Sequence, residues 1–324
     1  MSEVILTREG LRARSAPLWL DATRKTARSF VSHAHGDHIG RHAEAIGTAA
    51  TLALMAQRLP TARTIHRAVE YRRAFDLGPL RVELLPAGHV LGSAQIRIAV
   101  RGHRTVYTGD LDTSPSRTAE PVEVAACDTL VIESTFGQPR YRFPPREEVE
   151  ARIGAFAQAA LDQGATPVFL AYALGKAQEA TRILGEQGFR VRVHPDAWRL
   201  CEIYRAHGVD FPNAAALAAS PEPGEVIVAP PRADLRSLNR RGPTRTCALT
   251  GWAIDPATRF RFRSDEALPL SDHADFEGLV AYAKATGASR VLTTHGSADA
   301  LARELRARGL DARPLRPSDQ LELF

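Results

Sequence analysis

Three imidazoles and a carboxylate fall within six consecutive positions of this chain, in an H-x-H-x-D-H motif at residues 33–38. Because buried polar groups without partners cost free energy, such a run cannot fill a core. We expect a loop at the carboxyl end of a strand, in which His33 and His35 point one way. Asp37 and His38 then point the other way, and Zn²⁺ accepts both ligand types, so the spacing predicts two metal ions. The alternative is a polar turn with solvated histidines.

Three more ligand-type residues each follow an expected strand, at wide spacing along the chain. In each case a neighbouring glycine lets the backbone turn sharply. The three are His89 in Pro86-Ala87-Gly88-His89, Asp110 in Tyr107-Thr108-Gly109-Asp110, and His295 in Thr293-Thr294-His295-Gly296. Taken alone, each has an alternative, since Gly-Asp is an ordinary turn and a single histidine after a strand is commonly a surface residue.

Together with the motif, these residues make up two predicted metal-binding sets that share one carboxylate. The first set is His33, His35 and His89, the second is Asp37, His38 and His295, and Asp110 is placed to bridge both. The ligand types and their number therefore predict a dinuclear centre.

The composition is that of a globular chain. Of the 324 residues, 44% are hydrophobic and 24% are charged, values that separate the chain from disordered ones. There is no apolar run of membrane-spanning length, and residues 1–10 lack the apolar core of a signal peptide. The three cysteines, Cys127, Cys201 and Cys247, are scattered in apolar surroundings. They indicate buried thiols in a reducing compartment, so we predict a cytoplasmic protein.

A net charge of +5 favours an anionic partner, but only modestly. One stretch gathers arginines, at Arg232, Arg236, Arg240, Arg241 and Arg245. Arg259, Arg261 and Arg263 alternate along an expected strand, which would place them on one face. Either group could hold a phosphate backbone or form a solvated face, and the sequence leaves both interpretations open.

Expected strands and helices alternate along the chain, which predicts an α/β fold. Strand patterns lie at 81–85, 95–100, 104–107, 129–133, 168–170, 189–193, 226–228, 247–249 and 290–293, and helix patterns at 146–163, 176–186, 198–207, 276–285 and 300–308. The section from 138 to 255 is regular and holds no metal-ligand candidate, so we expect it to be an inserted domain. The metal domain would then consist of residues 1–137 and 256–324.

The motif and its downstream partners resemble the metallo-β-lactamase superfamily, and specifically its dinuclear phosphodiesterase branch. The resemblance covers nearly the whole chain and implies an αββα sandwich that carries the inserted α/β domain. It also implies that Asp21, in Trp19-Leu20-Asp21, braces the metal loop from behind the ligands. From the residues alone, Asp21 could equally belong to a turn or cap a helix.

Three sites are similar to motifs of the β-CASP nucleases, a group with such an insert. Glu133 ends the expected strand at 129–133, His273 lies in Leu270-Ser271-Asp272-His273-Ala274-Asp275, and His295 completes the set. The stretches 173–179 and 249–253 also match the β-CASP insert. The compact length looks most like the bacterial ligase-associated exonucleases, a DNA-repair branch, which implies a DNA ligase or helicase as a partner.

For the reaction, the resemblance implies metal-dependent cleavage of a nucleic acid, with two zinc ions, or manganese, as cofactors. His273, which neither metal set requires, is the candidate acid for the leaving oxygen, and Glu133 would orient it. Asp37 and Asp110 join them as catalytic residues. A plain structural interpretation is that Glu133 caps the strand end and that His273 is a loop histidine.

The candidate substrate-binding residues are Lys176, Ser134, Arg232 and Arg236. Lys176 begins an expected helix, so its ammonium group and the first helix amides could face phosphate, although a packed lysine gives the same pattern. We expect single-stranded DNA as the substrate and an exonuclease in DNA repair. The alternative is an RNA-processing nuclease of the mRNA 3′-end or RNase J type. His295 favours that alternative, because RNA-acting members carry histidine there.

Two other classes of function remain open. A small-molecule hydrolase of the same superfamily, such as a thioesterase or lactonase, would share the motif at 33–38. It would have no need of an inserted domain or of the Glu133–His273 pair. A metal-bearing binding subunit would have lost ligands, whereas every expected ligand position in this chain is filled. The nuclease is therefore the favoured hypothesis.

Overall fold

The structure is a computed structural model that describes residues 2–60, 63–218, 221–234 and 242–317. It divides into two compact units, of which the first is discontinuous in sequence. The first unit comprises Met1–Thr113, Ala119–Tyr141 and His273–Phe324, and the second comprises Ser114–Thr118 and Arg142–Asp272.

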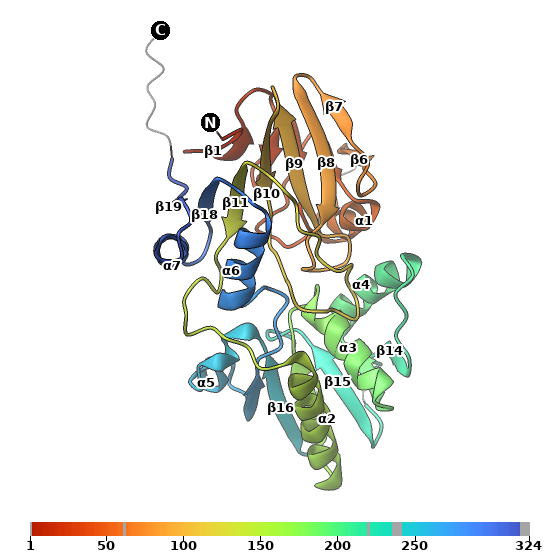
Figure 1. Ribbon diagram of the computed structural model, residues 1–324. Coiled ribbons are helices and arrows are strands. Elements are labelled where there is room, and N and C mark those ends of the chain that lie inside the picture. The colour runs from red at the N-terminus through yellow and green to blue at the C-terminus, as the bar shows by residue number, and fades with distance from the viewer. Residues whose placement is uncertain (1, 61–62, 219–220, 235–241, 318–324) are drawn as a thin grey trace. The chain divides into compact units, whose positions relative to one another are not determined.

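Two sheets form the first unit (Figure 1). The first sheet has its strands in chain order: β1 (Val4–Thr7), β2 (Gly10–Ala13), β3 (Trp19–Leu20), β4 (Arg28–Phe30), β5 (Glu44–Gly47) and β6 (Ile65–Ala68). The second sheet has the order β19-β18-β11-β10-β9-β8-β7. Its strands are β7 (Phe75–Leu77), β8 (Leu80–Pro86), β9 (Ala94–Val100), β10 (His103–Tyr107), β11 (Thr129–Glu133), β18 (Arg290–Thr294) and β19 (Ala312–Pro314).

The two sheets pack face to face over a shared apolar core. Leu20, Phe30 and Ile46 contribute to this core from the first sheet, and Val82 and Ile96 from the second. Along β8, apolar and polar residues alternate, so one face of the strand is buried and the other is more accessible.

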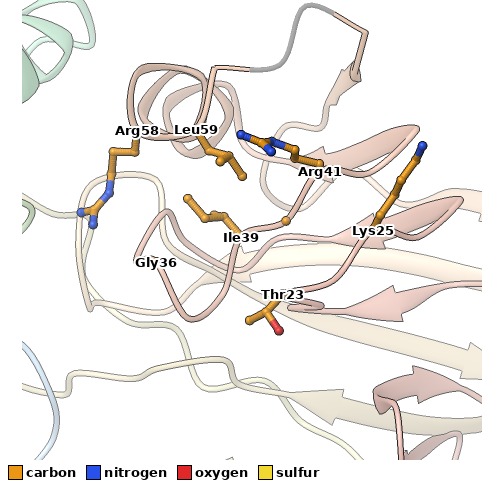
Figure 2. A pocket seen from close by; sticks show the side chains of 8 residues that line it. Thr23, Lys25, Gly36, Ile39, Arg41, Arg58 and Leu59 are labelled. Carbon is orange, nitrogen blue, oxygen red and sulfur yellow. The ribbon is translucent and has the colours of Figure 1, made fainter.

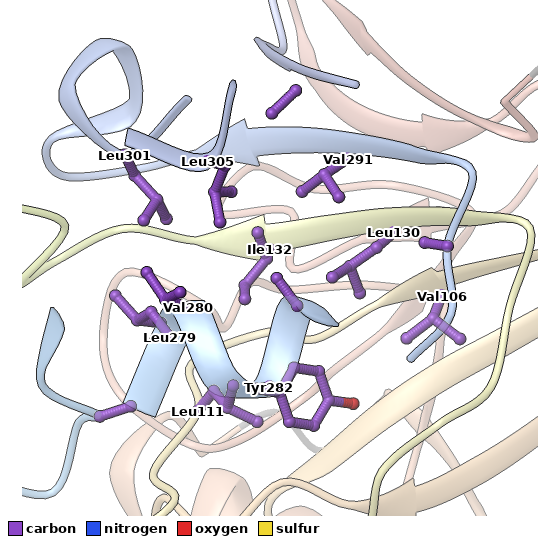
Figure 3. Close-up of a cluster of buried hydrophobic side chains, with 14 of the residues drawn as sticks. Val106, Leu111, Leu130, Ile132, Leu279, Val280, Tyr282, Val291, Leu301 and Leu305 are labelled. Atoms are coloured by element: carbon purple, nitrogen blue, oxygen red, sulfur yellow. The ribbon is translucent and has the colours of Figure 1, made fainter. Parts of the chain in front are cut away.

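Helices cover the outer faces of the two sheets. On the second sheet, α6 (Phe276–Ala285) and α7 (Ala298–Ala307) bury Leu279 and Leu305 against Val106, Leu130 and Ile132, as Figure 3 shows. The helix α1 (Ala49–Arg58) packs against β5 and β6 and starts at the side-chain cap of Thr48. This layering confirms the predicted αββα sandwich.

The second sheet brings several strand ends to one edge. The strands β10, β11 and β18 are parallel neighbours, and β8 runs the same way because β8 and β10 are both antiparallel to β9. Their carboxyl ends therefore share an edge, and the residues at or just after those ends are His89, Asp110, Glu133 and His295. The shared direction of these strands therefore brings four residues that are far apart in the sequence to one edge of the sheet.

The second unit is built on a sheet in which every strand pair is parallel, in the order β14-β13-β15-β12-β16-β17. The strands are β12 (Thr166–Leu170), β13 (Arg190–Val193), β14 (Ala214–Ala216), β15 (Glu225–Ala229), β16 (Thr244–Leu249) and β17 (Glu266–Leu268), and the helices are α2 (Arg146–Asp162), α3 (Lys176–Glu186), α4 (Pro195–Ala206) and α5 (Thr258–Phe262). Fully buried strands such as β15 are typical of parallel sheets with both faces covered. The predicted α/β class is confirmed.

Two expectations differ from the structure around residue 260. The segment with Arg259 and Arg261 is the helix α5, not a strand, and Arg263 ends it in a left-handed conformation, so these arginines do not share a strand face. The strand that pairs with β16 at this side of the sheet is β17. Because β17 belongs to the sheet, the second unit continues to Asp272, beyond the boundary at 255 that the sequence suggested.

Two structural findings bear on the compositional expectations. No helix within the described residues is long and apolar enough to cross a membrane. Cys127, Cys201 and Cys247 are all buried free thiols, and burial raises the pKa of each.

A buried carboxylate ties residues 114–118 into the second unit. Glu179 of α3 accepts hydrogen bonds from the guanidinium of Arg146 at 2.7 Å, the backbone N–H of Arg117 at 3.0 Å and the Thr118 hydroxyl at 2.7 Å. Burial raises the pKa of Glu179, but Arg146 and these hydrogen bonds lower it more, so the net shift is downward. The ionised form is therefore the one that stabilises this unit.

We predict that Glu179→Gln destabilises the protein at pH 7 by about 1.5–3 kcal/mol, because partners of a charged acceptor lose part of their hydrogen bonding. Since the folded pKa lies below the unfolded one, Glu179 stabilises the wild type above about pH 4.3, and this contribution is lost as the pH falls through the folded pKa. Urea unfolding from pH 7 to 3 should therefore show a shallower acid decline in the variant. Glu202→Gln, at an exposed position of α4, is the matched control, and parallel declines in wild type and Glu179→Gln would refute the assignment.

Candidate metal centre

Close backbone approaches at two glycines shape the loops that carry two of the predicted ligands. At Gly88, which precedes His89, φ is +81° and a Cβ atom would lie 2.1 Å from the carbonyl oxygen of Asp112. At Gly109, which precedes Asp110, φ is +57° and a Cβ atom would lie 2.5 Å from Cβ of Ser32. Only glycine fits both the left-handed conformation and these contacts, so the two glycines fix where His89 and Asp110 leave the backbone.

The structure brings the first predicted metal set together. Ligand atoms of His33, His35, His89 and Asp110 all lie within 4.8 Å of one another, and this group could hold a metal ion. Three of the four residues are buried, and His35 is half-buried. The ring nitrogens Nε2 of His33 and Nε2 of His89 lie 3.4 Å and 3.7 Å from Oδ2 of Asp110.

The surroundings of His33 fit a metal cation. Its Nε2 atom is buried and has no hydrogen-bond partner in the described part of the chain. Burial, with the neighbouring imidazoles, lowers the pKa of His33 well below its usual range, so the ring is neutral at pH 7. A buried neutral imidazole nitrogen without a hydrogen bond is costly, whereas the same lone pair is a good ligand for a divalent metal such as Zn²⁺.

The second predicted set is looser than the first. His38 is buried, and its Nε2 atom lies 3.5 Å from Oδ2 of Asp110 and 3.8 Å from Oδ2 of Asp37. The ring of His295 is 5.8 Å from that of His38, between centroids, and both Asp37 and His295 are exposed. The structure thus places all four residues around one locus, with two of them open to solvent.

Negative charge is concentrated around His38. Burial lowers the pKa of this imidazole, but Asp110, Asp21 and Asp37 raise it more, to about 10. Three carboxylates around one imidazole are the environment that a cation would neutralise. The donor set and the charge therefore agree with the expectation of divalent metal.

Asp21 lies directly behind the metal loop. Its Oδ1 accepts the backbone N–H of Ser32 at 2.7 Å, and its Oδ2 accepts the hydroxyls of Ser32 at 2.7 Å and Tyr107 at 2.8 Å. The same Oδ2 lies 3.0 Å from Nδ1 of His38. Asp21 has a φ of +50°, a conformation that aspartate tolerates better than most residues. The carboxylate thus fixes the ring of a predicted ligand and the start of the loop, which is the bracing geometry that the resemblance implies.

Two positioning residues escaped the sequence analysis. Ser32 connects Asp21 to the loop, and its hydroxyl also lies 3.0 Å from Nδ1 of His33. Tyr107 is fully buried at the end of β10, so its hydroxyl needs a partner, which Asp21 supplies. Their positions in the sequence could have indicated this role, because Ser32 and Tyr107 each lie at or just before a loop that carries a predicted ligand.

His273 and Glu133 form a close pair at the same edge of the second sheet. Nδ1 of His273 lies 2.9 Å from Oε1 of Glu133, which is fully buried at the end of β11. Glu133 also accepts the backbone N–H groups of Leu111 and Thr135, at 2.9 and 3.0 Å. Burial raises the pKa of Glu133, but His273 and these hydrogen bonds lower it more, so the carboxylate is ionised. An ionised carboxylate only accepts, so Nδ1 of His273 donates to it.

Ser134 holds the loop of His295. Its hydroxyl donates to the carbonyl oxygens of Thr294 at 2.9 Å and His295 at 2.5 Å. His295 has a φ of +57°, an uncommon conformation outside glycine that surrounding contacts must maintain. Ser134, which we expect to bind substrate, is buried and makes these two backbone contacts.

The other expected substrate-binding residues lie in the second unit. Lys176 is buried, forms an ion pair with Asp272, and its Nζ lies 5.4 Å from the ring centroid of Tyr172. Its ammonium group is therefore already engaged by a carboxylate. Arg232 is exposed, whereas Arg236, like Arg240 and Arg241, lies outside the described residues.

The αββα sandwich, with clustered histidines and aspartates at a sheet edge, defines a metallo-β-lactamase type of protein. The model of the family described as "Beta-lactamase superfamily domain" matches residues 7–171. The chain belongs to this superfamily, which confirms the resemblance noted from the sequence. Over most of its length the fold is also similar to that of a crystal structure of a protein of unknown function from Enterococcus faecalis V583. The TM-score is 0.61 at 14% identity, with 86% of this chain and 76% of that one covered.

Two curated relatives are nucleic-acid enzymes by name. A "Probable DNA ligase" of Opitutus terrae is 39% identical over 308 residues, which cover 94% of this chain and 30% of that protein. An "RNase aCSPSF2" of Saccharolobus solfataricus is 28% identical over 196 residues, which cover 51% of this chain and 39% of that protein. The chain thus spans well under half the length of both relatives.

We predict that Asp21→Ala weakens metal binding by about 10–100-fold, the usual effect of removing a partner that orients a metal ligand. Tyr107→Phe should also weaken metal binding, but by less, because Asp21 keeps its contacts to Ser32 and His38. Equilibrium dialysis against Zn²⁺ with metal analysis measures both, with Asp76→Ala, at an exposed carboxylate, as the control. Unchanged affinity in Asp21→Ala would show that Asp21 has no part in the centre.

Proposed function

We propose that this protein is a two-metal phosphodiester hydrolase that acts on nucleic acid, as a single-strand DNA exonuclease in DNA repair. The observation that carries the proposal is the convergence of two features on one sheet edge. One is the group of predicted ligands His33, His35, His89 and Asp110, in which the buried Nε2 of His33 has no hydrogen-bond partner among the residues that the structure describes. The other is the hydrogen-bonded pair of His273 and Glu133.

The residues suited to hold metal fall into two sets that share Asp110. His33, His35 and His89 would hold one ion, and Asp37, His38 and His295 a second. Bound divalent ions, zinc or manganese, would supply the Lewis acidity that phosphodiester hydrolysis needs at neutral pH. The exposure of Asp37 and His295 leaves the second set accessible to a substrate phosphate.

His273 is the residue suited to protonate the leaving group. Its Nδ1–H is held by Glu133, which leaves Nε2 as the atom that can carry a transferable proton. As water attacks phosphorus it gives up one proton to the solvent, the P–O bond to the leaving oxygen breaks, and that oxygen takes the proton of Nε2. Glu133, anchored by Leu111 and Thr135, fixes the ring orientation and balances the imidazolium charge.

Similarity supports DNA over RNA as the substrate. The relative named as a DNA ligase matches 94% of this chain, whereas the relative named as an RNase matches 51% at lower identity. A DNA ligase or helicase is accordingly the partner we propose, and the free buried cysteines agree with a reducing cytoplasm. The second candidate function is an RNA-processing nuclease, which the RNase relative and the histidine at position 295 favour.

The proposal predicts that the purified, metal-loaded protein shortens end-labelled single-stranded DNA from one end and spares circular single-stranded DNA. Matched RNA should be degraded more slowly, and treatment with a chelator should abolish all cleavage. Denaturing gel electrophoresis of time courses distinguishes these products. Rapid cutting of circles, or a strong preference for RNA, would move the assignment to the RNA-processing alternative. Turnover of thioesters or lactones without any nuclease activity would contradict both.

We predict that His273→Ala lowers kcat on oligonucleotides by about 10²–10⁴-fold, the usual cost of losing a general acid. Metal content should stay at the wild-type level. Hydrolysis of bis-p-nitrophenyl phosphate should fall far less, because its leaving group needs little protonation. His66→Ala, at an exposed histidine of β6, is the control. Equal losses on good and poor leaving groups would rule out His273 as the acid.

A further inference from the structure

A basic pocket of about 530 Å³ lies in the first unit, beside the metal loop. Three cationic residues, Lys25, Arg41 and Arg58, line it together with Ile39, Leu59 and Gly36, and none of its described lining residues is acidic. Figure 2 shows Ile39 and Leu59 toward its middle, with Arg58 on one side and Lys25 and Arg41 on the other. The pocket thus combines an apolar floor with a cationic rim.

Two of the three cations on the rim, Lys25 and Arg41, are available to an anion. Lys25 and Arg41 are exposed and form no ion pair with any residue that the structure describes. Arg58, also exposed, stands at the end of α1. Lys25 and Arg41 are therefore suited to phosphate, which arginine can bind through two N–H groups at once.

The pocket is continuous with the predicted metal loop. Gly36 lies between the candidate ligands His35 and Asp37, and Ile39 follows His38 directly. Consecutive Cα atoms are about 3.8 Å apart, so the pocket wall is one residue from three candidate ligands. A Cβ atom on Gly36 would meet nothing within 4 Å, so this wall is bare backbone next to open space.

The pocket is also held rigidly to that loop. A Cβ atom on Gly40 would lie 2.7 Å from the carbonyl oxygen of Ala22 and 3.0 Å from that of Arg24. The loop after His38 therefore packs closely on the segment that carries Lys25. A group bound in the pocket is in this way positioned relative to the metal loop by packed backbone.

We propose that this pocket binds one nucleotide unit of the substrate strand next to the scissile phosphate. Of the two phosphates that flank this nucleotide, one contacts Arg58 and the other contacts Lys25 and Arg41, and the base between them packs against Ile39 and Leu59. The volume suits a single nucleotide, and the apolar floor accepts any base because it offers no hydrogen-bonding code. The proposal rests on the proposed nuclease function and adds a binding subsite to it.

The test compares a triple variant, Lys25→Ala, Arg41→Ala and Arg58→Ala, with the metal-loaded wild type on two substrates. With a single-stranded DNA 20-mer, kcat/KM should fall by about tenfold or more. Its salt dependence should become shallower by about 0.7 in log–log slope for each phosphate contact removed. With bis-p-nitrophenyl phosphate, which has no neighbouring nucleotide, kcat and KM should stay at wild-type values.

A matched control removes the same charge elsewhere in the first unit. Arg8→Ala, Arg313→Ala and Lys284→Ala also delete two arginines and one lysine, all exposed and none lining the pocket. This control should keep wild-type kinetics on both substrates. Equal losses of kcat/KM in both triple variants would show that the effect comes from net charge, and would overturn the subsite. Unchanged kinetics in the pocket variant would overturn it as well.

A competition measurement separates the subsite from the proposed function. Oligo(dT) should inhibit hydrolysis of bis-p-nitrophenyl phosphate, with an inhibition constant about tenfold higher in the pocket variant. If the wild type cleaves no nucleic acid but shows this pocket-dependent inhibition, the function fails and the nucleotide subsite stands. If inhibition by oligo(dT) is equal in both proteins, or is instead matched by an acidic peptide, the subsite is refuted.

Discussion

The buried imidazole of His33 is the constraint on which the centre depends. Its Nε2 has no hydrogen-bond partner in the described part of the chain and lies 3.4 Å from a carboxylate oxygen of Asp110. A fold keeps such an atom only if something else compensates for its desolvation. A metal cation would do so, and it would also neutralise the carboxylates gathered around His38. A metal site therefore explains why this imidazole and these carboxylates lie together, whereas ordinary core packing does not.

The sandwich supplies the rigidity that such a centre needs. Parallel strands of the second sheet deliver His89, Asp110, Glu133 and His295 to one edge, with α6 and α7 packed behind. Asp21 accepts hydrogen bonds from Ser32 and Tyr107 and in this way fixes the start of the metal loop. The contacts behind the ligands are themselves buried, so ligand geometry is coupled to core packing.

Local pattern was enough to predict much of the fold, and four of the predicted metal ligands, His33, His35, His89 and Asp110, lie together in the structure. The bounds of α3 and α6 match the helix patterns read at 176–186 and 276–285, because amphipathic periodicity is a local property. The strand before the motif at 33–38 was expected and is β4, but β1 to β3 and β5 to β7 were not, since strands of two to four residues carry little periodic signal. The helix α1 was not expected either. The ion pair of Lys176 with Asp272, the Tyr107 contact to Asp21, and the pocket of Lys25, Arg41 and Arg58 all join residues distant in sequence. Only tertiary structure brings such residues together.

The most direct test of the account is the number and position of metal ions in the purified protein. Anomalous diffraction from crystals grown with Zn²⁺ or Mn²⁺, with metal analysis of the same sample, measures both. The account predicts two ions per chain, one held by His33, His35 and His89, the other by Asp37, His38 and His295, with Asp110 reaching both. A stoichiometry of zero after reconstitution, or ions bound elsewhere while Nε2 of His33 stays without a ligand, would contradict it.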